Sequence, residues 1–507
     1  ETGEIKRYEK LKRRVPHGLM ELMDISGFGP QSLKKLHKEL KVKTKDEVIA
    51  ALEDGRVSAL KGFGQKKVDN MLRGLKLHKG VEDRMLLWDA IQVGENLISV
   101  LKDFPGIKKV ELAGSLRRAK ETIGDIDILA EVTQRDRKKV SENFTGSKFA
   151  QKMLAKGDTR ASIILKQSGR QADLRMVDES EWGAALQYFT GSKEHNIHLR
   201  TLAKDRGYKI SEYGIFNIRN NKRLAGKTEN AIYQSLGMEF IPPELREDRG
   251  EIERALKGKL PELVELKDIK GDLHTHSNWS DGLHTLEEIV EFVQKKFYYD
   301  YIAVTDHSKS ERVAGGMDEK GFLKQFKAIK TLNEKLGRNF LKSGVEVDIL
   351  TDGSLDLSDE VLEQFDWVTA SIHSGFKSNN TDRLIKACEH PRVHCIGHPT
   401  GRIVGKREPY PLDMKDVIEA ARKTGTALEI NAQPDRMDMN DELAYMVRES
   451  GVMIVISTDS HKLSDFYFMR LGVEIARRAW CSAENILNTR SWKDLQRIFS
   501  KKKLANA

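Results

Sequence analysis

The amino-acid sequence predicts a multidomain α/β protein, and three observations support this fold class. The chain has 507 residues, more than one ordinary hydrophobic core accommodates, which indicates about three or four domains. Residues 1–80 contain two glycine-punctuated helical segments. From residue 271 onward, short apolar strands alternate with amphipathic helices, a pattern that is typical of a parallel sheet or barrel.

Changes in this pattern divide the chain into four segments. Residues 1–80 are expected to form a helical module, and residues 81–240 mix helix and strand. Residues 241–270 are rich in proline and charge, which predicts a linker with one short helix. Residues 271–507 form the predicted C-terminal βα domain.

The composition indicates a globular protein of a reducing cytoplasm. Hydrophobic residues make up 39% of the chain and charged residues 32%. No apolar run approaches the roughly 18 residues that span a bilayer, and the first residues lack the apolar region of a signal peptide. The three cysteines are too few for a disulfide framework. We therefore expect no membrane partner and no secreted, disulfide-linked fold.

Positive charge is concentrated near the N-terminus. Residues 1–80 hold 19 Lys and Arg against 11 Asp and Glu, so they carry most of the net charge of +9. A basic block of this kind favours binding to phosphate backbones, because binding releases condensed counterions. A solvated lysine-rich surface is the alternative interpretation.

Two similar segments repeat within this basic block, LMDISGFGPQSLKKL at 22–36 and VSALKGFGQKKVDNML at 57–72. Each glycine pair permits a tight turn at a helix N-terminus, where backbone N–H groups bind a phosphate oxygen without any side chain. Packing hairpins without a ligand are the alternative. The segments resemble helix–hairpin–helix motifs, and their repetition favours sequence-independent contacts to DNA. The expected contact residues are Gly27, Gly29, Gly62, Gly64, Lys66 and Lys67.

Three carboxylates form the first candidate metal site. Asp125 and Asp127 stand two positions apart in a strand-like run, so both side chains leave the same face. Asp173 lies on another alternating strand that is expected to run alongside. Because nearby carboxylates repel each other, a shared divalent cation is the simplest compensation, and three acids can hold two Mg²⁺ or Mn²⁺. Solvated strand-end acids are the alternative.

The stretch GSLRR precedes these acids within one strand–helix–strand unit. A glycine turn at Gly114, the hydroxyl of Ser115 and the guanidinium of Arg118 suit the binding of β- and γ-phosphates.

Together, AGSLRR…GDIDIL, DLRMV and ALQYFTGSKEHN resemble the nucleotidyltransferase palm of the family X DNA polymerases. The resemblance implies that Asp125, Asp127 and Asp173 hold two catalytic metals while a primer 3′-OH attacks the α-phosphate of a dNTP. It also implies that Tyr188 and Phe189 press against the sugar, although core packing is the alternative for such aromatics. With Gly114, Ser115 and Arg118, the implied nucleotide contacts are Gly124, Tyr188, Phe189, Gly191, Asn196, Arg200 and Tyr213.

The C-terminal segment contains seven predicted strands, and six of them end in candidate metal ligands. Function in βα barrels is built at this end of the strands. A lone histidine there is more often a satisfied core residue, but six of the chain's 14 histidines and three acids recur in this pattern. Nine such ligands predict two or three Zn²⁺ or Mn²⁺. They are His274, His276, Asp281, His307, Glu346, His373, His398, Asp459 and His461.

One strand and one acidic residue of this segment are not counted among the predicted ligands. The strand at 425–432 supplies no clear ligand, and Asp306 is expected to support the ligands from outside.

Residues 271–480 resemble the PHP family, named for polymerase and histidinol phosphatase. This resemblance implies a distorted (β/α)7 barrel with a trinuclear site. A palm followed by a PHP barrel is similar to the long bacterial and archaeal family X polymerases. It implies a base excision repair enzyme that acts on gapped or primed DNA with dNTPs. The barrel would supply a 3′-5′ exonuclease, other 3′ end processing or an AP endonuclease. We expect a cytoplasmic, nucleoid-associated monomer.

The N-terminal domain of that family normally starts earlier, with another hairpin and, in some members, a lysine that forms a Schiff base with an abasic sugar. This sequence begins ETGEIKRYEKL. It therefore predicts weak or absent abasic lyase activity, with Lys6, Lys10 and Lys12 as surface residues.

Two other functions compete with this interpretation. A template-free nucleotidyltransferase with a phosphoesterase domain is disfavoured by the hairpin pair and by the YFTGS segment. A non-catalytic DNA-end-binding scaffold is disfavoured because every expected acid and histidine is present.

Overall fold

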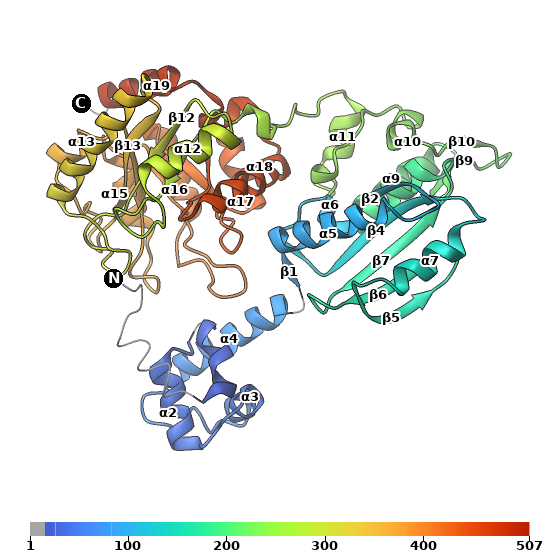
Figure 1. Ribbon diagram of the computed structural model, residues 1–507, viewed down its shortest axis with the longest axis horizontal. Coiled ribbons are helices and arrows are strands. Elements are labelled where there is room, and N and C mark those ends of the chain that lie inside the picture. Colours follow the sequence, from blue (N-terminus) through green and yellow to red (C-terminus); the bar gives the residue numbers. More distant parts are fainter. Residues whose placement is uncertain (1–15, 26, 83, 506–507) are drawn as a thin grey trace. The chain divides into compact units, whose positions relative to one another are not determined.

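The protein is described here by a computed structural model that covers residues 16–25, 27–82 and 84–505. Lys6, Lys10 and Lys12 therefore lie outside the described residues. The chain divides into two compact units, one formed by residues 1–84 with 402–409 and the other by residues 85–401 with 410–507 (Figure 1). No helix among the described residues is both long enough and apolar enough to cross a membrane.

The first unit is helical, as the sequence predicts. Its hydrophobic core includes Phe28 and Phe63, one from each Gly-Phe-Gly turn. Gly27 has a φ of +96°, and a Cβ placed on it would lie 2.9 Å from Cγ of Met71, so the first repeat approaches the last helix too closely for a side chain. The elements are η1 (His17–Asp24), α2 (Pro30–Leu40), α3 (Lys45–Glu53) and α4 (Gln65–Glu82).

The second unit begins with a mixed five-stranded sheet in the order β2-β4-β7-β6-β5. Strands β4 and β7 are parallel, and the other neighbours are antiparallel. The strands are β2 (Ile107–Leu112), β4 (Asp125–Val132), β5 (Ala150–Lys156), β6 (Arg160–Leu165) and β7 (Gln171–Val177). A short antiparallel pair, β1 (Met85–Leu86) and β3 (Thr122–Ile123), lies beside α5 (Leu87–Leu101). Helix α6 (Gly114–Arg117) contacts β4, and α7 (Arg137–Thr145) contacts β5 and β6.

A small subdomain with its own hydrophobic core follows this sheet, and Leu199, Ile215 and Tyr233 belong to that core. A buried ion-pair network ties the subdomain to the sheet, because Glu229 accepts hydrogen bonds from Arg117 and from the fully buried Arg246. The elements are α8 (Trp182–Thr190), α9 (Lys193–Asp205), β8 (Tyr208–Ser211), β9 (Gly214–Asn217), β10 (Arg223–Ala225) and α10 (Glu229–Ser235).

Residues 241–270, which the sequence predicts to be a linker with one short helix, contain short helical elements that pack into the fold. They form η2 (Pro243–Leu245), α11 (Glu251–Leu256) and η3 (Leu266–Asp268). Arg246 and Glu251 are fully buried, and Leu245 and Ile252 join the core of the preceding subdomain. Some charged residues of this segment are therefore buried and paired, which a composition count cannot distinguish from solvated charge.

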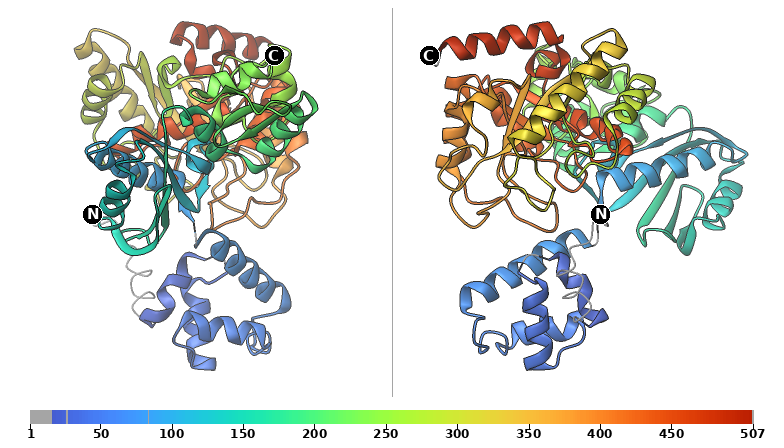
Figure 2. Two further views of the ribbon diagram at one scale, coloured as in Figure 1. Left: turned by 90° about the vertical axis from the view of Figure 1, so that its right-hand side faces the viewer. Right: turned by 60° about the vertical axis from the view of Figure 1, so that its left-hand side comes forward.

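The C-terminal part is a seven-stranded parallel barrel in sequential order, as predicted (Figures 1 and 2). A parallel bridge between Thr275 and Ser460 joins the first strand region to the last. Every strand residue is buried, which explains the nearly continuous apolar runs. The strands are β11 (Gly271–Thr275), β12 (Tyr301–Val304), β13 (Leu341–Asp348), β14 (Trp367–Ser371), β15 (Cys395–Ile396), β16 (Ala427–Asn431) and β17 (Ile454–Ser457).

Amphipathic helices surround this barrel and bury their apolar faces against it (Figure 2). They are α12 (Leu286–Lys296), α13 (Glu319–Leu336), α14 (Asp359–Leu362), α15 (Thr381–Glu389), α16 (Met414–Thr424), α17 (Asp441–Glu449), α18 (Met469–Arg478) and α19 (Trp492–Ala505). The 3-10 turns η4 (Leu463–Phe468), η5 (Ala483–Asn485) and η6 (Leu487–Thr489) complete the C-terminal part.

The buried network around Glu229 predicts a measurable stability effect. Glu229→Gln leaves the guanidinium groups of Arg117 and Arg246 without their shared carboxylate, which costs about 3 kcal/mol of unfolding free energy. Urea unfolding followed by tryptophan fluorescence measures the loss. Glu179→Gln is the matched control, because its pair with Lys227 is exposed. Equal unfolding midpoints for the two variants would show that the network is not stabilising.

Candidate catalytic and metal-binding sites

The three palm acids meet at the edge of the mixed sheet. Asp125 and Asp127 both lie on β4, and Asp127 stands opposite Asp173 in the parallel register with β7. A carboxylate oxygen from each acid lies within 4.8 Å of the other two. Asp125 is exposed while Asp173 is buried, so the cluster opens to one side. The structure thus brings together the three acids that the sequence singled out.

The electrostatics of this cluster fit a bound cation. Burial, together with the negative charges of Asp125 and Asp173, raises the pKa of Asp127 to about 7. Asp173 is held by donors from β6, since Ser162 donates a hydrogen bond to it and Arg160 Nη2 lies 3.2 Å from both of its oxygens. Sequence analysis missed Ser162 and Arg160, because strand register decides which residues face Asp173.

A glycine brings the turn that the sequence predicts to bind phosphate against these acids. Gly114 has a φ of +59°, and a Cβ placed on it would lie 2.1 Å from Oδ2 of Asp127. Any larger residue would therefore displace Asp127. Ser115 is half-buried one position later, and Gly124 directly precedes β4. The absence of a side chain at Gly114 thus allows the backbone of this turn to approach Asp127 directly.

Arg118 lies beside the segment that follows α8. Its Nε donates to Glu247 Oε1 at 3.1 Å, and its Nη1 donates to the carbonyl oxygen of Thr190. A Cβ on Gly191, which has a φ of +71°, would lie 3.0 Å from Arg118 Nη1. The predicted phosphate-binding arginine and the predicted YFTG segment are thus in contact.

The remaining predicted nucleotide contacts lie on or near this segment. Tyr188 and Phe189 form an edge-to-face pair with ring centroids 5.2 Å apart at the end of α8. The amide of Asn196 is engaged within the fold, since it donates to the carbonyl of Tyr188 and accepts from Gln187. Arg200 is exposed and donates to the carbonyl of Asn196. Tyr213 is 54% exposed at the β8–β9 turn.

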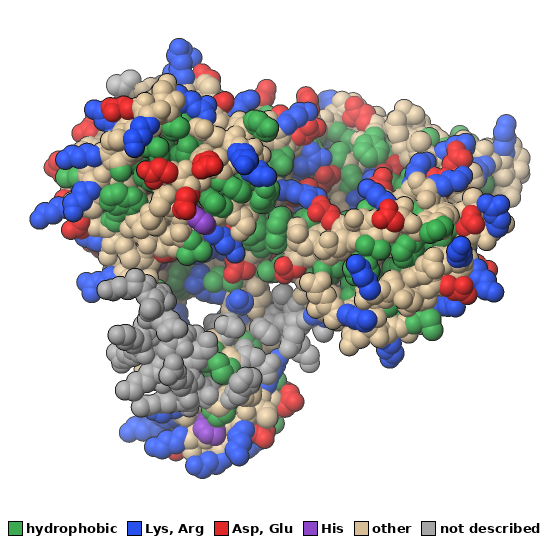
Figure 3. Space-filling model, in the orientation of Figure 1, with side chains coloured by type: hydrophobic (Ala, Val, Ile, Leu, Met, Phe, Trp, Pro, Cys, Tyr) green, Lys and Arg blue, Asp and Glu red, His purple; other side chains and the backbone are tan. Residues whose placement is uncertain are grey.

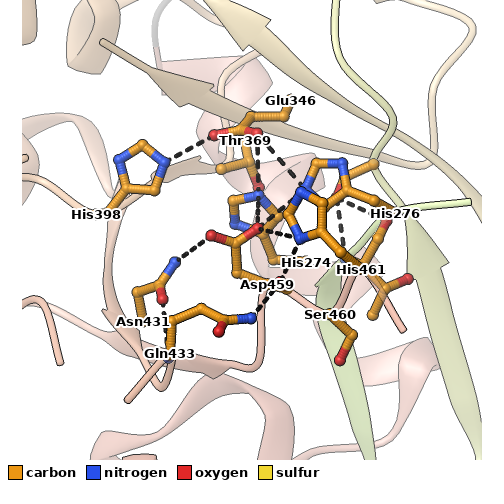
Figure 4. A network of polar contacts seen from close by, with 12 residues as sticks. His274, His276, Glu346, Thr369, His398, Asn431, Gln433, Asp459, Ser460 and His461 are labelled. Carbon is orange, nitrogen blue, oxygen red and sulfur yellow. Dashed lines mark hydrogen bonds and ion pairs between the residues drawn. The ribbon is translucent and has the colours of Figure 1, made fainter. Parts of the chain in front are cut away.

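In the barrel, Glu346 is the centre of the second candidate site. It lies on β13, is buried, and contacts five of the six predicted histidines. Its Oε2 lies 3.3 Å from His274 Nε2, 3.6 Å from His276 Nε2 and 3.1 Å from His307 Nδ1. Its Oε1 lies 3.3 Å from His373 Nε2 and 2.9 Å from His398 Nε2. Figure 4 shows Glu346 above this group of imidazoles.

Asp459 and Asp281 complete the cluster from the opposite side. Asp459 Oδ1 lies 3.0 Å from His276 Nε2, and Asp281 Oδ2 lies 3.2 Å from His461 Nε2. The rings of His276 and His461 stack with centroids 4.3 Å apart. All nine predicted ligands are thereby gathered at the carboxyl ends of the strands.

The charge states of these acids and histidines are suited to a divalent metal site. Neighbouring imidazoles give Glu346 and Asp459 pKa values well below the ordinary range in spite of burial, so both acids are ionised. Burial and the nearby His461 and His307 lower the pKa of His276 to about 3, which leaves a neutral ring. Both ring nitrogens of His276 are buried without a hydrogen bond. The acids in turn raise the pKa of His373 to about 10 and the pKa of His461 to about 9, so protonated rings balance the acids in the absence of a cation, and Zn²⁺ or Mn²⁺ would take the place of those protons.

The helical module places its predicted DNA contacts on two equivalent turns. Gly62 has a φ of +85°, matching Gly27, and α2 and α4 begin directly after Gly29 and Gly64. Lys66 is exposed, whereas Lys67 lies 3.9 Å from the ring centroid of Phe63. The turns therefore share one local geometry.

Comparison with known families assigns three parts of the chain. Residues 19–77 match the SAM-like helix-hairpin-helix tandem, residues 185–247 the DNA polymerase beta thumb, and residues 272–433 the PHP domain. The DNA polymerase/3'-5' exonuclease PolX of Bacillus subtilis (strain 168) is 39% identical over 500 residues, which cover 98% of this chain and 87% of that protein. The chain belongs to the family X DNA polymerases that carry a PHP domain.

Two shorter relatives match less than half of this family X polymerase. A probable phosphatase of Thermoanaerobacter sp. (strain X514) is 30% identical over 233 residues, which cover 43% of this chain and 89% of that protein. A probable phosphatase of Caldanaerobacter subterraneus subsp. tengcongensis is 29% identical over 247 residues, which cover 46% of this chain and 92% of that protein.

Sequence analysis of this family X polymerase missed the residues that hold the barrel ligands from behind. Strand β16, which was expected to supply none, carries Glu429, whose Oε1 lies 2.7 Å from His274 Nδ1 and whose Oε2 accepts from the backbone of His398. Asn431, two positions on, donates to Asp459 at 3.0 Å (Figure 4). Polar residues at 429 and 431 of an otherwise apolar strand were the available signal.

Asp306, expected to support the ligands from outside, lies behind the loop that follows β11. It accepts hydrogen bonds from the backbone and hydroxyl of Ser277 and from Gln325. Its carboxylate therefore fixes the loop between His276 and Asp281, and its backbone oxygen accepts a hydrogen bond from the backbone N–H of Glu346.

Glu429→Gln tests this supporting contact. The amide no longer holds His274 as a charged acceptor, so we expect metal affinity to fall by roughly 10- to 100-fold while all nine predicted ligands remain. Manganese titration of the metal-free protein measures the change. Glu419→Gln, an exposed glutamate on α16 of the same barrel, is the control. Unchanged manganese affinity in Glu429→Gln would refute the supporting role.

Proposed function

We propose that this chain is a DNA repair polymerase that adds dNTPs to a primer 3′-OH in gapped DNA and processes 3′ ends with its barrel. The observation that carries the proposal is the pair of separate cation-type sites, one in the palm and one in the barrel. Membership of the family X polymerases and the similarity to a polymerase/3'-5' exonuclease support it.

The palm residues are suited to nucleotidyl transfer. Two Mg²⁺ or Mn²⁺ ions held by Asp125, Asp127 and Asp173 would lower the pKa of the attacking hydroxyl and neutralise the leaving pyrophosphate. The turn at Gly114 offers backbone N–H groups to the triphosphate, with Ser115 beside them. Arg118 brings a fixed positive charge close enough to act on Asp127. These residues hold the nucleotide and orient its phosphates for in-line attack.

The barrel residues are suited to phosphoester hydrolysis. Two or three Zn²⁺ or Mn²⁺ ions held by the nine predicted ligands would supply Lewis acidity for the attack of water. Glu346 and Asp459 contribute ionised oxygens, and the buried rings of His274 and His276 exclude bulk water. The proposed reaction is removal of a 3′ nucleotide.

A second barrel activity is favoured by the phosphatase relatives, which are similar to this chain over a length close to that of residues 271–507. Hydrolysis of a terminal 3′ phosphate needs the same donor set as hydrolysis of a diester. A 3′-phosphorylated primer tests both, because the product chain lengths differ.

The helical module is proposed to grip the DNA backbone. Lys34, Lys38 and Lys41, on and directly after α2, are exposed. Figure 3 shows Lys and Arg side chains gathered at the lower end of the module. We propose a monomer acting in the cytoplasm at the nucleoid, where the gapped substrate occurs.

Asp127→Asn separates the two proposed activities. The palm loses one of three charges for its cations, so extension of a labelled gapped primer falls at least about a hundredfold, whereas 3′ trimming without dNTPs is retained. Denaturing gels with Mg²⁺ or Mn²⁺ measure both reactions. Asp158→Asn changes an exposed aspartate in the β5–β6 turn and serves as the control. Parallel loss of both activities in folded Asp127→Asn would contradict two independent sites.

His276→Ala provides the reciprocal test. Its ring bridges the Glu346 and Asp459 sides of the barrel cluster, so trimming and bound metal are lost while gap filling persists. Elemental analysis and the same gels give the two readouts. His284→Ala removes a half-exposed histidine from the same loop and is the control. Wild-type metal content in His276→Ala would exclude His276 as a ligand.

A further inference from the structure

A buried chain of ionic contacts runs from the palm into the barrel. Arg478, at the end of α18, is 2% exposed. Its Nη1 donates to Glu247 Oε1 at 2.9 Å and to the backbone oxygen of Arg118 at 2.7 Å. Its Nη2 donates to Asp441 Oδ2 at 2.7 Å. Arg478 of the barrel therefore contacts both the Glu247 carboxylate, which binds the Arg118 side chain, and the backbone of Arg118.

Glu247 connects the two arginines. The oxygen that accepts from Arg478 also accepts from Arg118 Nε, and Lys120 Nζ lies 3.8 Å from the other oxygen. Burial tends to raise the pKa of Glu247, but Arg478, Arg118 and Lys120 lower it below the ordinary value. Glu247 is thus an ionised, immobilised acceptor, and its position depends on Arg478.

These contacts leave one edge of the Arg118 guanidinium available. Nε is bound to Glu247 and Nη1 to Thr190, while Nη2 makes no hydrogen bond within the described part of the chain. A guanidinium clamped at two nitrogens has little rotational freedom, so its third nitrogen is preorganised for an anion. Arg118 also acts electrostatically on Asp127, which places its charge beside the palm acids.

We propose that Arg478 is a positioning residue for the nucleotide site, because it fixes Glu247 and the Arg118 backbone and thereby orients Arg118 toward the triphosphate of a dNTP. The inference rests on the proposed polymerase function. It means that a residue of the barrel helps to set the nucleotide affinity of the palm.

The contacts of Arg478 favour a positioning role over a contribution to folding stability alone. Burying an arginine among charged partners gains little net folding free energy, because desolvation offsets the Coulombic attraction. Arg478 nevertheless reaches three acceptors from two separate nitrogens, a spacing that the planar guanidinium spans and the compact ammonium of lysine does not. Asp441 is itself held by Arg249 at 3.1 Å, so the far end of Arg478 is also fixed.

The test compares Arg478→Gln with Arg477→Gln in the full chain. Arg477, the neighbouring residue on α18, donates hydrogen bonds to Glu244 and to the carbonyl of Val264. These contacts do not include Glu247 or Arg118. Single-nucleotide gap filling gives kcat and the KM for dNTP, and fluorescence anisotropy gives the Kd for gapped DNA.

We expect Arg478→Gln to raise the KM for dNTP about tenfold, as the loss of one charged hydrogen-bond partner implies. DNA affinity and 3′ trimming should change less than about twofold.

Two further variants keep the inference testable if Arg478→Gln folds poorly. Glu247→Gln removes the intermediate acceptor and should produce a similar rise in the KM for dNTP. The double variant should be no worse than the more affected single variant, because both act through one contact. Arg478→Lys should have a KM for dNTP between that of the wild type and that of Arg478→Gln.

The inference is overturned if Arg477→Gln and Arg478→Gln raise the KM equally, because that result reports only a weakened interface. It is also overturned if Arg478→Gln and Glu247→Gln leave the KM for dNTP unchanged in an enzyme whose wild type fills gaps. A wild-type chain that fails to extend the gapped primer would instead overturn the proposed function.

Discussion

Charged groups interact strongly when they are held a few ångströms apart in a medium of low dielectric constant, and both candidate sites depend on this: carboxylates repel one another in the palm, and imidazoles attract carboxylates in the barrel. In the palm the repulsion contributes to raising the pKa of Asp127 to about 7. In the barrel, Glu346 and Asp459 stay ionised only because imidazoles surround them. Such clusters are unfavourable in an otherwise empty fold, and a divalent cation relieves the repulsion. The rest of the architecture serves to hold these groups in place.

Parallel strands provide the means of convergence. In the palm, the single parallel pair β4–β7 sets Asp127 opposite Asp173. In the barrel, seven parallel strands bring residues from 274 to 461 to one rim. Each site then has a supporting layer: Ser162 and Arg160 behind Asp173, and Glu429 and Asn431 behind the barrel ligands. The ionic chain through Arg478 is a third such layer, which joins the two catalytic parts.

The candidate ligands that the structure brings together could be selected from sequence, because their signal is local. An aspartate pair on one strand face, or a histidine at the end of an apolar run, is visible within a few residues. Their supporting residues could not be predicted in the same way. Ser162 stands opposite Asp173 because of the register between β6 and β7, and Arg478 reaches Arg118 across 360 positions of sequence. Residues 241–270 show the same limit, because the partners of Arg246 and Glu251 decide that their charges are buried.

Anomalous diffraction from crystals soaked in manganese tests the central claim most directly, because it locates cations without relying on activity. The account predicts one set of peaks among Asp125, Asp127 and Asp173, and a second set of two or three peaks around Glu346 and Asp459. Peaks absent from both clusters at saturating manganese, with the side chains turned away from each other, would contradict it.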